Sequence, residues 1–151
     1  MSWFRTVTTD ISRLPDAIDW FESQLSDARI ETSLKGNVEK TARDLPGIIE
    51  HRFNQLQEIE AILEHLNIEL RRLRSNHFKR YLEHYNRAMS SRDAEKYSDG
   101  EPEVLDMQKL INEFALVRNK FQGLVKAIDS KQFMISNVVK LRAAGMEDAS
   151  I

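Results

Sequence analysis

The sequence contains no cysteine, and it has only five glycines and three prolines in 151 residues. Without cysteine the chain can form no disulfide, thiolate metal site or cysteine nucleophile. The scarcity of glycine and proline, together with 41% hydrophobic and 30% charged residues, favours a folded helical protein over a disordered one. No apolar run approaches the roughly 20 residues of a membrane span, and the N-terminus lacks the apolar core of a signal peptide. We therefore expect one soluble structural unit, without membrane association.

Motifs for enzymatic chemistry are also missing. The five glycines stand singly, so the sequence has no glycine-rich phosphate loop and no nucleophile elbow. A helical di-iron site needs a glutamate three residues before a histidine, and none of the four histidines has one: His51, His65, His77 and His84. We expect a non-enzymatic protein with no metal and no cofactor.

The apolar residues recur at steps of three and four, which predicts amphipathic helices and no strands. A first helix is expected from Leu14 to about Ala28, and it should end near "TSLKGN". In "RDLPG", Asp44 is a suitable cap and Pro46 a suitable early helical residue, and nothing from there to Met89 would stop a helix. At 1.5 Å per residue, those roughly 40 residues would span about 60 Å, so the helix needs partners along its length.

The C-terminal third repeats this pattern with coiled-coil spacing. After a short helix capped by Ser90 with Asp93 and a loop at "SDGEP", a heptad pattern begins. A last helix is expected from about Ser130 to Ala144, ending at Gly145. The heptad residues are Met107, Leu110, Phe114, Val117, Phe121, Leu124 and Ile128, and the last helix turns Met134, Val138 and Leu141 to one side.

So much apolar surface can be buried in two ways, by folding the chain into a monomeric bundle or by association of several chains. The heptad alone does not separate them, and we favour a homo-oligomer. The predicted organisation is an N-terminal helical extension (1–43), a long helix carrying a basic segment (44–92) and a C-terminal helical oligomerisation region (103–151). The predicted fold class is all-α, with long amphipathic helices.

The net charge of −2 hides an uneven distribution along the chain. Residues 1–67 hold seven Lys/Arg against twelve Asp/Glu, residues 68–92 hold seven against two, and residues 93–151 hold eight against ten. The basic charge is therefore concentrated in the segment "IELRRLRSNHFKRYLEHYNR" (68–87), which also contains three aromatic residues. Such a concentration can attract an acidic partner even when the whole chain is nearly neutral.

On a helical wheel the basic segment separates into two stripes. A basic stripe about 100° wide lies beside an aromatic stripe that Arg71 and Arg74 flank. Cations beside stacking rings are the combination that single-strand binders use. The basic stripe contains Arg72, Lys79, Arg80 and Arg87, and the aromatic stripe contains Phe78, Tyr81 and Tyr85.

Other interpretations of the segment stay open. Glu83 lies inside the basic stripe, four residues from both Lys79 and Arg87, so part of the charge can be held in weak pairs along the helix. The aromatic residues can equally belong to a core. A surface for an acidic protein partner, on a structural or chaperone-like coiled-coil protein, is therefore the alternative to nucleic-acid binding.

From about Asp44 onward, the order of segments resembles the UvsY family of recombination mediator proteins from tailed phages. The resemblance covers roughly two-thirds of the chain, through "DLPGIIEHRFNQLQEIEAILEHLNIELRRLR", "FKRYLEHYNR" and "LINEFALVRNKFQGLVKAIDSKQFMISNVVKLRAAGMED". Its most specific part is "AIDSKQFMISNVVKLRAAGMED", which looks like the closing helix pair of the family. No catalytic motif is part of the match.

The resemblance implies a ring-forming, all-helical protein of the cytoplasm of the infected host cell, with a hexamer or heptamer as the expected assembly. It implies binding to single-stranded DNA, to the phage strand-exchange recombinase and to its single-strand-binding protein. The protein would help the recombinase replace the single-strand-binding protein in recombination, repair and recombination-dependent replication. Assembly through the C-terminal helices would agree with the heptad.

The resemblance also implies where the DNA contact lies. Family members use a segment of the form Leu-Lys-x-Arg-Leu-acidic-Tyr-Tyr, and "FKRYLEHY" holds this place. Tyr81 stands at the position of the family arginine, with Arg80 one residue earlier, and His84 replaces the first tyrosine. The matching positions are Lys79, Leu82, Glu83 and Tyr85.

Overall fold

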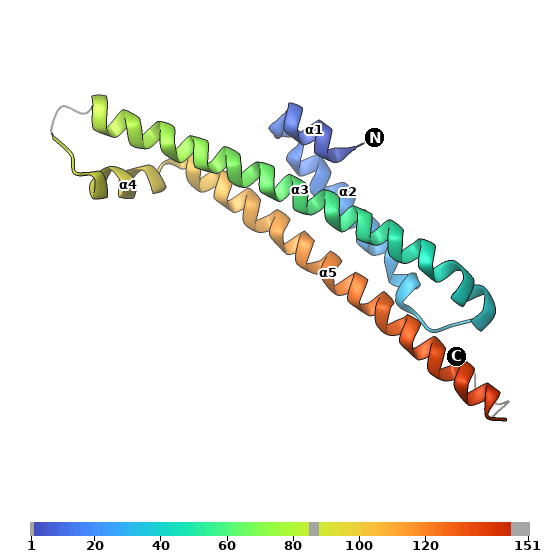
Figure 1. The fold of residues 1–151 in the computed structure, drawn as a ribbon. Helices are drawn as coiled ribbons and strands as arrows, with labels where there is room; N and C mark the ends of the chain where they lie inside the picture. Colours follow the sequence, from blue (N-terminus) through green and yellow to red (C-terminus); the bar gives the residue numbers. More distant parts are fainter. Residues whose placement is uncertain (1, 85–87, 146–151) are drawn as a thin grey trace.

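The structure, a computed structural model, describes residues 2–84 and 88–145, and its fold is all-α as predicted. Two very long helices form the body of the molecule: α3 (Val38–His84) and α5 (Pro102–Ala143). They run antiparallel and side by side (Figure 1), and the short helix α4 (Ser91–Asp99) lies between them in the sequence. The N-terminal part folds into α1 (Trp3–Thr9), a 3-10 turn at Ile11–Arg13, α2 (Leu14–Ala28) and a second 3-10 turn at Arg29–Thr32.

The start of α3 lies earlier than the sequence suggested. The predicted boundary at Asp44 is wrong, because the helix begins at Val38 and runs through Pro46 without ending. Asn37 caps it by accepting a hydrogen bond from the Lys40 backbone N–H at 3.1 Å. Burial of Val38 and Leu45 on the same side of the helix outweighs the hydrogen bond that proline cannot donate.

The C-terminal region is one helix, not two. The predicted boundary near Ser130 is wrong, since α5 continues from Pro102 to Ala143. No glycine or proline lies between Gly123 and Gly145, and Ile128, Lys131 and Ile135 continue the buried side of the helix. The predicted end is confirmed: Gly145 follows the helix with φ +87°, the left-handed conformation that glycine adopts without strain.

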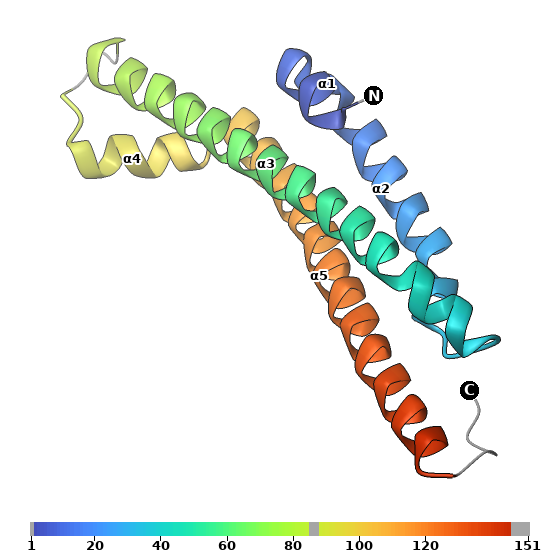
Figure 2. The same ribbon diagram turned by 45° about the vertical axis from the view of Figure 1, so that its right-hand side comes forward.

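The turn between the long helices matches its prediction. The Ser90 hydroxyl accepts a hydrogen bond from the Asp93 backbone N–H at 3.2 Å, which caps the start of α4. Helix α4 ends at Asp99 and α5 begins at Pro102, so only Gly100 and Glu101 form the loop within "SDGEP". This short connection holds α4 close to the start of α5 and under the end of α3, as both ribbon views show (Figure 2).

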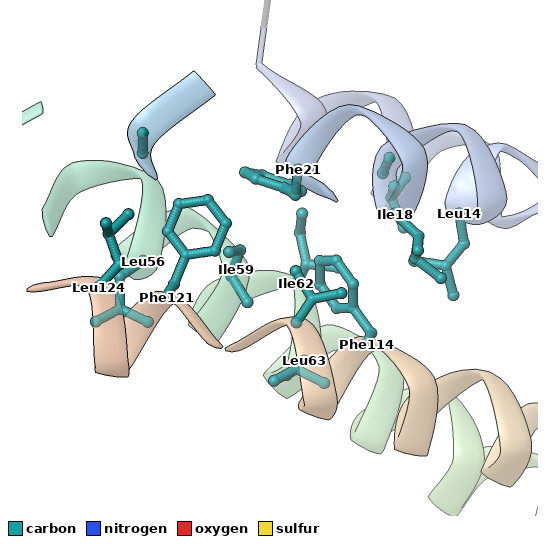
Figure 3. Close-up of a cluster of buried hydrophobic side chains, with 14 of the residues drawn as sticks. Leu14, Ile18, Phe21, Leu56, Ile59, Ile62, Leu63, Phe114, Phe121 and Leu124 are labelled. Atoms are coloured by element: carbon teal, nitrogen blue, oxygen red, sulfur yellow. The ribbon is translucent and has the colours of Figure 1, made fainter. Parts of the chain in front are cut away.

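The N-terminal segment is a third layer of the core. Helix α2 packs against the middle of the two long helices (Figure 3), and the Phe21 ring lies 5.9 Å from the rings of both Phe114 and Phe121. At the start of α1, Glu58 of α3 accepts a hydrogen bond from the Phe4 backbone N–H at 2.9 Å, and its negative charge suits a helix N-terminus. Residues 1–43 were predicted as an extension, and their described part closes the bundle.

A buried polar network fixes the N-terminal segment in register. Arg52 of α3 is only 4% exposed, and its guanidinium donates to both carboxylate oxygens of Glu31 at 2.7 and 2.8 Å. The same group donates to Gln24 and Gln55 at 3.1 and 3.0 Å, while Lys131 of α5 donates to the Glu31 backbone carbonyl at 2.9 Å. A buried cation with all these partners is compensated, whereas loss of one partner would leave an uncompensated charge.

Most of the predicted oligomerisation residues are covered within one chain. Of the ten predicted side chains, five are buried in the core and three are half-buried against it. An interface between chains that keeps this fold would therefore use other surface. The buried five are Phe114, Val117, Phe121, Leu124 and Ile128, and the half-buried three are Met107, Leu110 and Val138.

The end of α5 keeps apolar surface exposed. The last turns of α5 extend past the start of α3 (Figure 1), and the predicted residues Met134 and Leu141 are exposed there. Phe133, at 70% exposure, adds to this surface. These three residues, the α5 end surface, lie within about 100° of one another around the helix and are exposed in the described chain.

Truncation of Phe21 tests whether the N-terminal layer is part of the core. Phe21→Ala should lower the free energy of unfolding by about 3–5 kcal/mol, because a fully buried ring is replaced by a cavity. Ile30→Ala serves as the control, and it should cost less than about 1 kcal/mol because its side chain is 78% exposed. Urea denaturation followed by circular dichroism measures both values, and equal small losses would contradict the packing described here.

Candidate nucleic-acid interface

The basic segment occupies the last turns of α3, and α4 lies against one side of it. The structure therefore divides the predicted site residues into two groups by their relation to α4. Arg71, Arg72 and Lys79, the outer cations, are exposed. Arg74, Arg80 and Tyr81, the inner group, contact the acidic segment formed by α4 and the start of α5.

The outer cations are only weakly neutralised. Arg71 has no ion pair within residues 2–84 and 88–145. Lys79 Nζ lies 4.0 Å from Glu83 Oε1, which confirms the expected pair along the helix, and exposed pairs of this kind contribute little. Arg72 pairs with Glu69 one turn earlier. Positive charge on this side of α3 is therefore accessible to an anion.

Arg74 is held by the end of α4. Its Nε lies 3.1 Å from Asp99 Oδ1, and its Nη2 donates to Gln108 of α5 at 3.4 Å. The Nε atom is buried, yet the direction of its N–H gives it no hydrogen bond within the described chain. The contact with Asp99 is thus an ion pair without the directional bond that makes guanidinium–carboxylate pairs strong.

Glu101, in the loop before α5, gathers the rest of the inner group. It accepts hydrogen bonds from the Tyr81 hydroxyl and, at 3.3 Å, from Arg80 Nη2. His77, 8% exposed, lies between two carboxylates, with Nδ1 3.9 Å from Glu101 and Nε2 3.2 Å from Glu103. The inner group is therefore bound to carboxylates of its own chain.

The aromatic stripe is also split. Tyr81 is half-buried and its ring lies 5.7 Å from the ring of Tyr97 on α4, tilted by 33°. Tyr97 is 57% exposed, so the outer face of this ring pair is open to solvent. Phe78 is half-buried and lines a cavity of about 470 Å³ beside Arg74 and α4. Tyr85 and Arg87, also predicted to bind nucleic acid, lie outside the described residues.

The acidic segment against the basic one was missed at the sequence level. Residues 68–84 hold five Lys/Arg against two Asp/Glu, which is +3, and residues 91–103 hold two against five, which is −3. A helical wheel of the long helix shows only the basic segment, because the acidic segment belongs to the next helix and its flanking loop. The signal was present in the sequence, because the two stretches are separated by a turn short enough to bring them together.

The described residues hold no candidate metal centre and no candidate membrane span. Across residues 2–84 and 88–145, no group of three or more His, Asp or Glu side chains is placed to hold a metal ion. Among the helices of that part of the chain, none is long and apolar enough to cross a membrane.

The Tyr81 hydroxyl lowers the pKa of the Glu101 carboxyl by donating a hydrogen bond, and the charges of His77 and Arg80 lower it further, against the opposing effect of partial burial. Because the pKa of Glu101 is lower in the folded protein than in the unfolded chain, the ionised carboxylate stabilises the fold at pH values above its ordinary pKa of 4.5. This contribution to stability is lost as the pH falls through the lower pKa of the folded protein.

Removal of that hydroxyl tests the contact. Tyr81→Phe should raise the pKa of Glu101 toward 4.5, as measured by NMR titration of the side-chain carboxyl carbon. Tyr97→Phe is the matched control, since the Tyr97 hydroxyl makes no hydrogen bond in the described chain, and the Glu101 midpoint should not move. An unchanged midpoint in Tyr81→Phe would contradict the hydrogen bond.

Comparison with known proteins adds no relative. No protein-family model, no curated protein and no solved structure matches this chain. The resemblance of residues 44–151 to the phage recombination mediators therefore stays a prediction. The structural basis for a function is the geometry of α3 and α4.

Proposed function

We propose that this chain is a non-enzymatic recombination mediator that binds single-stranded DNA. It would help a strand-exchange recombinase replace single-strand-binding protein in the cytoplasm of a phage-infected cell. The observation that carries the proposal is the exposure of the outer cations on α3, a helix that also carries Tyr81, whose ring pairs with that of Tyr97. Phosphates held by such cations and bases stacked on such rings are the two contacts of sequence-independent single-strand binding.

One protomer offers few cations, so self-association belongs to the proposal. Several weak sites on one assembly bind a long strand strongly, because each contact after the first is made at high effective concentration. The α5 end surface is the best candidate for the contact between protomers, since large apolar side chains there are exposed together. A ring of six or seven protomers is the assembly we propose.

A second candidate has its own support. Carboxylates of α4 and the start of α5 hold the inner group in the structure, and an acidic segment of another protein would offer the same kind of partner. The same ion pairs would be present in a structural coiled-coil protein whose basic segment binds an acidic protein partner. They would also be present if the basic segment only stabilised the turn between α3 and α5. Binding to single-stranded DNA separates the two candidates.

The outer cations are tested by a salt series. Wild-type protein should bind a labelled oligonucleotide of any base sequence, with log affinity falling linearly with log salt concentration. Arg71→Ala with Lys79→Ala should weaken binding and reduce the slope by about 1.4, the amount expected for two lost phosphate contacts on a single strand. Fluorescence anisotropy measures both quantities.

The control variant removes two positive charges from α5 and leaves α3 unchanged. Lys109→Ala with Lys126→Ala removes two exposed cations of α5 that make no ion pair in the described chain, and it should leave the slope close to that of the wild type. Equal slopes for the two double variants would move the DNA contact away from α3. No binding by the wild type at low salt would favour the second candidate.

Self-association is tested on the α5 end surface. Met134→Glu with Leu141→Glu should lower the mass in solution and weaken binding to a long single strand, while the helical content stays unchanged because both residues are exposed. Light scattering gives the mass. Leu105→Glu with Leu116→Glu, two exposed leucines elsewhere on α5, is the matched control and should keep the wild-type mass. The same mass for both variants would place self-association on other surface.

A further inference from the structure

We propose that α4 and Glu101 form a displaceable acidic cover, and that single-stranded DNA competes with this cover for Arg74, Arg80 and Tyr81. The inference rests on the proposed function and names how the same site is regulated. In the closed arrangement of the structure, the outer cations are available to a strand, whereas Arg74, Arg80 and Tyr81 are engaged by carboxylates. When the cover moves away, the inner group adds two guanidinium groups and a ring to the binding surface.

The first support is how little apolar burial holds the cover. Only Ala94 and Ser98 of α4 are buried, and Ala94 lies outside the main hydrophobic core. A nine-residue helix is too short to be stable alone in water, so α4 depends on its contacts with α3. The contacts of α4 with α3 include the ion pair of Asp99 with Arg74 and the ring contact of Tyr97 with Tyr81, whereas buried rings hold α2. Elements held in this way open more readily than the core.

The second support is the exposure of the ion pairs that close the cover. The side chains of Arg74 and Asp99 are 43% and 53% exposed, and the side chain of Arg80 is 56% exposed, while its partner Glu101 is 17% exposed. Ion pairs open to water contribute little to stability and weaken as salt rises. The buried Arg74 Nε without a directed hydrogen bond is a further sign that this pairing is not optimal.

The third support is chemical equivalence between the cover and a nucleic-acid strand. Carboxylates and phosphates both accept hydrogen bonds from guanidinium groups, and phosphates fit this donor well. The Tyr97 ring lies beside Tyr81 where a base could stack instead. Asp99, Glu101 and Tyr97 thus present to α3 two anionic groups and one ring, the same kinds of group that a short stretch of single strand carries.

Removal of the covering charges tests the competition. Asp99→Asn with Glu101→Gln deletes the two carboxylates that hold Arg74 and Arg80 but leaves every cation of the site in place. This double variant should bind a labelled oligo-dT roughly two- to tenfold more tightly than the wild type, the range expected for releasing two exposed ion pairs. Fluorescence anisotropy at fixed salt measures the affinities.

A matched variant separates specific competition from a change in net charge. Glu95→Gln with Asp106→Asn removes the same two charges from α4 and α5, at residues without an ion pair in the described chain. If the first double variant binds no more tightly than this control, the cover does not compete with DNA. If none of the proteins, wild type included, binds the oligonucleotide at low salt, the proposed function itself fails.

Hydrogen exchange provides a second readout on unaltered protein. Saturating oligo-dT should speed amide exchange in residues 91–99, because α4 leaves α3, while amides near Ile59 and Phe121 in the core keep their protection. Slower or unchanged exchange in α4 on DNA binding would overturn the proposal even if the charge variants bound more tightly.

Discussion

The apolar seam between α3 and α5 is the interaction on which the rest of the structure depends. Each helix exceeds 40 residues, far longer than a helix that is stable without packing. Their mutual burial fixes both helices along most of their length, but two helices alone leave one side of the seam open to water. Helix α2 covers the middle of that open side, and α4 lies along the end of α3, beyond the start of α5 (Figure 2).

Helices α2 and α4 are held against the long helices by different kinds of interaction. Helix α2 inserts Phe21 between Phe114 and Phe121, and the buried Arg52 adjoins it with its hydrogen bonds satisfied. Helix α4 is held by the ion pair of Asp99 with Arg74 and by the contact of the Tyr97 and Tyr81 rings, and Glu101 after it by Arg80 and the Tyr81 hydroxyl. Buried apolar contacts do not depend on charge screening, whereas partly exposed ion pairs weaken as salt rises. The attachment of α4 is therefore more sensitive to salt than that of α2.

The sequence predicted elements better than their boundaries and contacts. The helical spacing identified every long helix, but it could not say whether Phe114 and Phe121 pack within one chain or between chains, because both arrangements bury the same stripe. Pro46 indicated a helix start, although Asn37 was an equally good cap and burial of Val38 decided the outcome. The wheel found Glu83, a neighbour on the same helix, and missed Glu101, which only the folding of the turn brings to Arg80.

If DNA competes with the cover as we propose, the competition changes what a salt series measures. Each phosphate contact weakens as salt rises, because each counterion released from the strand gains less entropy in more concentrated salt. The ion pairs of Arg74 and Arg80 with Asp99 and Glu101 are screened by the same salt, so the cover also opens more easily. These two effects act on the observed affinity with opposite signs. A protein with its cover intact therefore shows a shallower slope than its number of phosphate contacts implies, and the slope of a protein without the cover reports those contacts more directly.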